Sequence, residues 1–136
     1  MPEYVLAKVI DALNERGRPI RRSKISILGM AYKRDVDDPR ESPGFALMDL
    51  LIQRGAKVTY NDPYIPALPV MRRYPHLSMN SHPLTEEYLQ NQDCILIVTD
   101  HSTYQWSWIV ENAALVVDTR NATSRVERFR ERIVLA

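Results

Sequence analysis

Apolar positions along the chain form two kinds of pattern, short uninterrupted runs and longer stretches with the period of a helix. Uninterrupted apolar and β-branched runs are typical of buried strands, and they occupy residues 25–28, 57–63, 94–100, 114–121 and 133–135. Helical spacing occupies residues 2–16, 42–52, 84–90 and 106–109. The order predicts an α/β fold, a three-layer sandwich with a Rossmann-like, mostly parallel sheet that one helix precedes.

The first strand and the second helix flank a loop that is crowded with charge. The strand stops at Gly29, and the helix has Ser42 as a candidate N-cap with Pro43 at its first position. In a doubly wound sheet such a loop lies where ligands bind, and the helix N-terminus suits a phosphate. The loop carries one more acid than it has bases, so a phosphate would need particular side chains. The alternative is a charged loop that is merely solvated.

The dinucleotide fingerprint Gly-x-Gly-x-x-Gly is missing from this loop. Gly29 is followed by Met30, Ala31, Tyr32 and Lys33. Without the later glycines, the backbone cannot approach a pyrophosphate as the fingerprint allows. We therefore expect a sheet of Rossmann shape that does not hold NAD in the usual way.

Three predicted strands end in polar groups, near Gly29, Asp100 and Asp118. If these strands are parallel, their ends lie along one rim of the sheet. Arg120 would then approach the same crevice as Lys33. Its alternative is a surface ion pair with Asp118.

Two segments show neither pattern. Residues 64–83 hold four prolines, which predicts an irregular connection with at most a short strand near 77–79. Residues 124–132 hold four arginines and two glutamates, which predicts a poorly ordered loop. In the helix between these segments, we expect Trp106 and Trp108 to turn their rings inward, or one of them to contribute to a subunit interface.

The cysteine, the histidines and the serine beside His101 predict no catalytic or metal site in this chain. Cys94, the single cysteine, opens an apolar strand and is expected to behave as a small hydrophobe. His76 and His82 have no ligand spacing to Asp, Glu or Cys, so we expect no metal site. His101 and Ser102 are adjacent and lack a Gly-x-Ser-x-Gly elbow, so we expect them to cap a turn rather than form a hydrolase pair.

Length and charge narrow the class of protein. The 136 residues fit one domain with its own core. The 18 basic and 17 acidic residues leave a formal charge of +1, so net charge predicts neither nucleic acid nor an acidic membrane as a partner. The chain has no apolar run of about 18 residues and no leader pattern, which predicts a cytoplasmic protein.

The run from Gly29 to Pro43 resembles the signature of the C-terminal domain of the UDP-glucose/GDP-mannose dehydrogenase family, whose members oxidise a nucleotide sugar at C6 to the uronic acid. The positions that keep the family's spacing are Lys33, Asp35, Asp38, Arg40, Glu41, Ser42 and Pro43. The resemblance continues through residues 55–66, 98–104 and 116–122. The opening MPEYV and the DTRN segment are most similar to the branch that acts on UDP-N-acetylhexosamines.

The resemblance implies a role for four residues. Lys33 would bind the phosphates or the sugar of the substrate nucleotide, and Tyr32 would line the same pocket. Arg120 would contact the UDP, and Arg40 would reach the pyrophosphate of NAD. No catalytic residue is expected here, because the family's catalytic cysteine lies in a glycine-rich motif of the preceding part of the enzyme, and that motif is missing from this sequence.

The resemblance also implies a domain organisation. Residues 1–20 would be the end of an interdomain helix and residues 21–136 a UDP-binding, Rossmann-like domain, with Met1 marking the boundary of a fragment. The expected partners are a UDP-sugar, the N-terminal NAD-binding and central domains of the same enzyme, and further copies in a homo-oligomer. The sugar stays open among glucose, N-acetylglucosamine and N-acetylmannosamine. The alternatives are a free-standing nucleotide-binding module and a dimerisation module.

Overall fold

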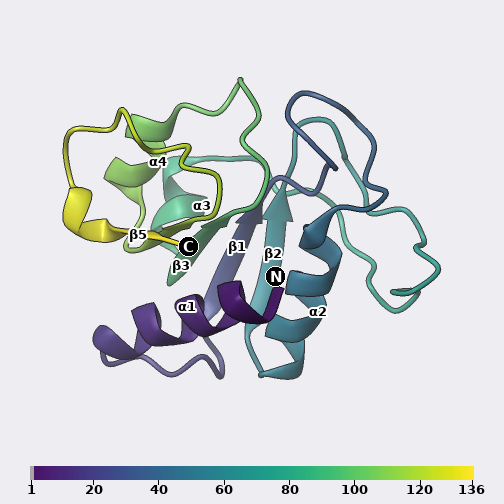
Figure 1. Cartoon of the computed structure of the whole chain (residues 1–136), viewed down its shortest axis with the longest axis horizontal. Helices are drawn as coiled ribbons and strands as arrows, with labels where there is room; N and C mark the ends of the chain where they lie inside the picture. Colours follow the sequence, from purple (N-terminus) through teal and green to yellow (C-terminus); the bar gives the residue numbers. More distant parts are fainter. Residues whose placement is uncertain (1) are drawn as a thin grey trace.

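The computed structural model describes residues 2–136, so Met1 and the expectation placed on it lie outside the described residues. The elements follow the predicted order (Figure 1). The helices are α1 (Pro2–Glu15), α2 (Pro43–Gln53), α3 (Glu86–Gln90) and α4 (Trp106–Asn112), with a 3₁₀ turn η1 (Arg130–Arg132). The strands are β1 (Lys24–Leu28), β2 (Lys57–Asn61), β3 (Cys94–Ile97), β4 (Val116–Asp118) and β5 (Ile133–Leu135).

The five strands form one sheet in the order β2-β1-β3-β4-β5, and every neighbouring pair is parallel. The prediction of a Rossmann-like parallel sheet is therefore confirmed. The order reverses between β1 and β3, because the chain first builds outward to β2 and then returns to the other side of β1. Such a switch point is where doubly wound sheets bind ligands, beyond the carboxyl ends of the strands.

Helices cover both faces of the sheet and make the three layers (Figure 1). Side chains alternate along each strand, so that Ile27 of β1 faces one core and Leu28 the other. Helices α1 and α2 share the core of Ile27, and α3 and α4 share the core of Leu28. The apolar stripe of α1 packs against α2, β3 and β4, so its own domain covers it.

Local signals placed α2 correctly. Ser42 has an extended backbone, and its side-chain Oγ accepts a hydrogen bond from the Gly44 N–H at 3.1 Å. Pro43 occupies the first helical position, where its missing N–H leaves no bond unmade. The cap fixes where the charged loop ends and the helix begins.

Three expectations about irregular parts of the chain need correction or refinement. Residues 77–79 form no strand, and the proline-rich connection is held by isolated bridges at Ala67–Asn80 and Met71–Tyr74. Trp106 and Trp108 are only half-buried, because α4 buries Ile109 and Val110 instead. Both tryptophans still pack against the edge of the core that α4 shares with α3, so the prediction of inward-facing rings is confirmed only in part.

The arginine-rich segment 124–132 has a defined conformation rather than that of a poorly ordered loop. Arg130 Nη1 donates to the carbonyl oxygens of Thr123 and Val126, at 2.6 and 3.0 Å. Arg132 Nη1 donates to the Glu111 carbonyl oxygen at the end of α4, at 2.7 Å. The guanidinium groups satisfy carbonyls that the turns and the helix end leave free.

Two kinds of feature are absent from the described residues. No helix within residues 2–136 is long and apolar enough to cross a membrane. Within the same range, no group of three or more His, Cys, Asp or Glu side chains could hold a metal ion.

Candidate functional site

The loops that follow β1, β2, β3 and β4 gather at the carboxyl edge of the sheet (Figure 1). Gly29 brings two of them into contact at the switch point. Its φ is +91°, and a Cβ placed there would lie 2.4 Å from Thr99 Cβ and 2.5 Å from the Thr99 carbonyl oxygen. The glycine is needed because the loop after β1 passes directly against the end of β3.

Asp62, one residue beyond the end of β2, organises the start of the charged loop. The backbone N–H groups of Met30 and Ala31 donate to its Oδ2 at 2.7 and 3.0 Å. The Tyr64 N–H donates to Oδ1 at 2.8 Å. Burial acts to raise the pKa of Asp62, but hydrogen bonds from His101 and from backbone N–H groups outweigh it, and the pKa lies below its ordinary value.

His101 joins this carboxylate to the next part of the loop. Its ring is fully buried, and Nε2 lies 2.9 Å from Asp62 Oδ2. Its Nδ1 accepts the backbone N–H of Asp35 at 2.9 Å. Because Nδ1 accepts this hydrogen bond, Nε2 is the ring nitrogen that can donate to Asp62.

Asp35 extends the hydrogen-bond network to Ser102, in the loop after β3. Its carboxylate accepts hydrogen bonds from the Ser102 N–H at 2.8 Å and from Ser102 Oγ at 2.5 Å. These bonds lower the pKa of Asp35 below its ordinary value. The loop after β1 is thus tied to residues that follow β2 and β3.

A second carboxylate, Asp100, lies between two arginines. Arg34 Nη2 is 2.6 Å from Asp100 Oδ2, and Arg120 Nε is 3.7 Å from Asp100 Oδ1. Asp100 is buried, whereas both guanidinium groups are substantially exposed. Oδ1 has no hydrogen-bond partner among the described residues. The edge of the sheet therefore presents two guanidinium groups over one buried negative charge.

Two hollows open beside this arginine pair. One, of about 640 Å³, also has the Trp106 ring, Arg125 and the side chains of Ser102, Ser107 and Ser124 in its lining. The other, of about 530 Å³, is completed by residues after β4 and at the C-terminal end. Arg34, Asp100 and Arg120 line both. Guanidinium groups and hydroxyls that converge on one hollow suit an anionic ligand with several oxygens.

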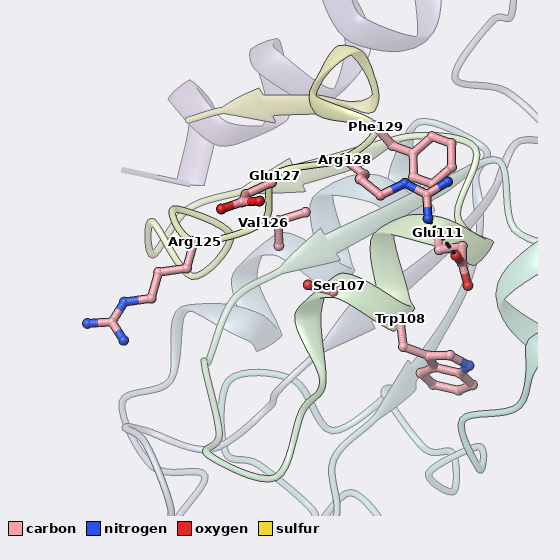
Figure 2. Close-up of a pocket in the computed structure, with 8 residues that line it drawn as sticks. All are labelled: Ser107, Trp108, Glu111, Arg125, Val126, Glu127, Arg128 and Phe129. Carbon is pink, nitrogen blue, oxygen red and sulfur yellow. Dashed lines mark ion pairs between the residues drawn. The ribbon is translucent and has the colours of Figure 1, made fainter.

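A further hollow, of about 410 Å³, lies between α4 and residues 125–129. Figure 2 shows Arg128 directed toward Glu111, 3.9 Å away, while the Arg125 side chain points away from them. The Arg128 guanidinium also lies over the Phe129 ring, 4.9 Å from its centroid. Its charge is thus already engaged within the chain, and this hollow contains none of the predicted site residues.

Comparison with known proteins decides the family. Residues 26–125 match the family described as UDP-glucose/GDP-mannose dehydrogenase family, UDP binding domain. The chain belongs to this family. It is 36% identical to a UDP-N-acetyl-D-mannosamine dehydrogenase of Methanococcus maripaludis over 107 residues, which are 77% of this chain and 22% of the relative.

Solved structures of the family show the same fold. An NDP-N-acetyl-D-galactosaminuronic acid dehydrogenase from Methanosarcina mazei Go1 superposes with a TM-score of 0.80 at 26% identity, over 100% of this chain and 28% of that chain. A UDP-glucose dehydrogenase from Pyrobaculum islandicum gives 0.64 at 27% identity, over 98% and 29% of the respective chains. The chain spans about a fifth of the curated relative and little more than a quarter of each solved structure.

The four predicted site residues do not lie together in the UDP-binding domain. Arg120 lies at the arginine pair and lines both hollows beside it. Its side chain does not pair with Asp118, whose Oδ1 instead accepts the Arg120 backbone N–H at 2.9 Å. The surface ion pair considered as an alternative is therefore wrong.

The other three residues lie on the exposed side of the charged loop. Tyr32 and Lys33 are exposed and line neither hollow of the arginine pair. Arg40 is exposed and forms a two-pronged ion pair with Asp38, at 3.0 and 2.9 Å. The crevice expected to hold both Lys33 and Arg120 finds no support in these hollows, and the roles of Tyr32, Lys33 and Arg40 remain predictions.

Sequence reasoning missed Arg34, Asp62 and Asp100. In the sequence, Arg34 is one of several charged residues of the loop and stands beside Lys33, and nothing local shows that it meets Arg120 through Asp100. His101 was expected to cap a turn, but it binds across loops. The adjacency of β2, β1 and β3 is the signal that could have found Asp62 and His101. Asp62 directly follows β2, and His101 lies in the loop after β3; both strands are next to β1.

Proposed function

We propose that this chain is the nucleotide-sugar-binding domain of an NAD-dependent UDP-sugar 6-dehydrogenase. The complete enzyme would oxidise the C6 hydroxymethyl group of a UDP-sugar to a carboxylate and so supply uronic acids for polysaccharide synthesis. The pairing of Arg34 and Arg120 over Asp100, at the carboxyl edge of the sheet, carries the proposal. It places two forked donors where a doubly wound fold binds phosphate.

Each predicted residue takes a separate part of this task. Arg120 contacts the UDP, and Arg34, which shares its hollow, adds a second guanidinium for the diphosphate. Lys33 and Tyr32, which line neither hollow of the arginine pair, reach the phosphates or the sugar from the exposed loop. Arg40 turns from Asp38 to the pyrophosphate of NAD, an exchange that is cheap because exposed ion pairs contribute little stability.

The remaining parts of the enzyme lie outside this chain. Cys94 is fully buried, and burial raises the pKa of its thiol to about 12, so it is no nucleophile. The catalytic cysteine and most contacts to NAD belong to N-terminal and central domains, to which residues 1–20 lead as the end of an interdomain helix. We expect the complete enzyme to be a homo-oligomer. The family branch that the relatives represent favours a UDP-N-acetylhexosamine as the substrate.

Kinetics of the complete protein test this proposal. Lys33→Ala should raise KM for the UDP-sugar by about tenfold or more, because a charge-assisted contact worth about 1.5–3 kcal/mol is lost. Lys57→Ala is the matched control, since Lys57 is an exposed lysine at the amino end of β2, away from the site. Unchanged KM and kcat in Lys33→Ala would refute the assignment of Lys33.

Calorimetry separates the proposal from its two rivals. The complete protein should bind UDP and NAD, and Arg120→Ala should weaken UDP binding while NAD binding persists. Equal UDP affinity of the isolated chain and the complete protein would favour a free-standing nucleotide-binding module. An absence of UDP and NAD binding in both would favour a dimerisation module.

A further inference from the structure

We propose that His101 is a positioning residue that fixes Lys33 and Arg34 by clamping the loop after β1 on both sides of them. On one side, Asp62 Oδ2 holds the N–H groups of Met30 and Ala31. On the other side, His101 Nδ1 holds the N–H of Asp35 at 2.9 Å. The hydrogen bond between His101 Nε2 and Asp62 joins these two contacts. Residues 32–34 are therefore held at both ends by the buried pair of His101 and Asp62.

The imidazole suits this role because one ring nitrogen faces a hydrogen-bond donor and the other faces an acceptor. The Asp35 N–H can only donate, so Nδ1 must present its lone pair. The Asp62 carboxylate, whose pKa is lowered, accepts from Nε2–H. The ring is fully buried, with the Tyr64 ring 4.7 Å and the Tyr104 ring 5.8 Å away between centroids. Both nitrogens are engaged, so His101 has a bridging role and no free site for proton transfer.

The backbone of the loop makes the clamp necessary. Asp35 has a φ of +60°, which a residue with a side chain adopts only at an energetic cost. The His101 bond to its N–H and the Ser102 bonds to its carboxylate hold it there. When the His101 bond is lost, the turn can relax, and relaxation moves Lys33 and Arg34 away from their positions beside the sheet edge.

Two substitutions separate the halves of the clamp. His101→Gln can still donate an amide N–H toward Asp62 but offers no acceptor at the Nδ1 position for Asp35. His101→Asn keeps an acceptor near Nδ1 and loses the donor to Asp62. His76→Gln is the control, because His76 is an exposed histidine that pairs with Asp49 of α2, outside the loop.

The first measurement needs no ligand. Nitrogen NMR of the chain should show an unprotonated Nδ1 and a protonated Nε2 at His101, and amide hydrogen exchange at Asp35 should rise about tenfold or more in His101→Gln. Exchange at β3 amides should stay as in the wild type, and His76→Gln should change neither. A proton on Nδ1 in the wild type would overturn the proposal even if His101→Gln fails to fold, and so would unchanged exchange at Asp35.

The second measurement rests on the proposed function and uses the complete protein. UDP affinity should fall about tenfold in His101→Gln, and by less in His101→Asn. A wild type that does not bind UDP would refute the proposed function alone, because the NMR and exchange results still decide the clamp. A wild type that binds UDP, with His101→Gln binding equally well, would overturn the positioning role.

Discussion

Replacing Gly29 with alanine should destabilise the protein far more than the same change at Gly17. Both glycines have a positive φ, +91° and +70°, so alanine is disfavoured at both by about 1–2 kcal/mol. They differ in their surroundings. A Cβ on Gly29 meets the Thr99 backbone at 2.5 and 2.7 Å, whereas a Cβ on Gly17 has no atom within 4 Å.

The difference between the two variants can be worked out from this contrast. The Thr99 atoms belong to the strand end and cannot swing away as a flexible side chain could, so the overlap adds about 1–3 kcal/mol, as in an overpacked core. We expect Gly29→Ala to lower the free energy of unfolding by about 2–5 kcal/mol and Gly17→Ala by about 1–2 kcal/mol. For a domain whose total is about 5–15 kcal/mol, the first loss is severe.

Urea denaturation monitored by circular dichroism measures both losses. The slope is about 1–3 kcal/mol per molar for a small protein, so the two midpoints should differ by roughly 1 M. Gly55→Ala provides an intermediate case, because its φ is +90° and its Cβ would lie 3.1 Å from the movable Arg21 Cγ. Equal losses in Gly29→Ala and Gly17→Ala would show that the contact with Thr99 is not tight.

Two further predictions concern the cap and the buried carboxylate. Ser42→Ala removes the acceptor for the Gly44 N–H and should lower the free energy of unfolding by about 1 kcal/mol in urea titrations; an unchanged midpoint would contradict the capping role. Asp62 has a lowered pKa, so its stabilising effect is present above the ordinary value of 3.8 and is lost as the pH falls through the lower folded value. Asp62→Asn should therefore be less stable than the wild type at neutral pH and should lose less stability on acidification. If both proteins lose the same free energy of unfolding as the pH falls, the stabilising role of the Asp62 carboxylate is disproved.

Local sequence signals predicted the helices and strands, but the contacts that form the site join residues far apart in the sequence. The start of α2 follows from Ser42 and Pro43, two adjacent residues whose preferences agree. The bonds that tie Asp35 to His101 join residues far apart in sequence, and they depend on the register of strands that no local pattern specifies. The pattern of strand ends placed Arg120 at the carboxyl edge of the sheet, where it lies beside Asp100, but it could not show that Arg34 would be its neighbour.

The arginine-rich segment shows how composition alone can mislead. A run rich in charge usually indicates a solvated chain, because charged groups resist burial. Arg130 and Arg132 instead donate to carbonyl oxygens of turns and of a helix end while their charges stay close to water. A guanidinium has five donors, and it can therefore hold several carbonyl oxygens of the backbone, while Val126 and Phe129 anchor the segment on the apolar core.

Asp100 acts as a built-in counterion for Arg34 and Arg120. Two guanidinium groups brought together without an anion would repel each other and spread apart, but the carboxylate beneath them offsets one of the two charges. Its Oδ1, which no described residue satisfies, leaves Arg120 only loosely tethered. Under the proposed function, a diphosphate would meet two guanidinium groups that Asp100 already holds close together, and the same carboxylate would weaken the binding of singly charged ions such as chloride.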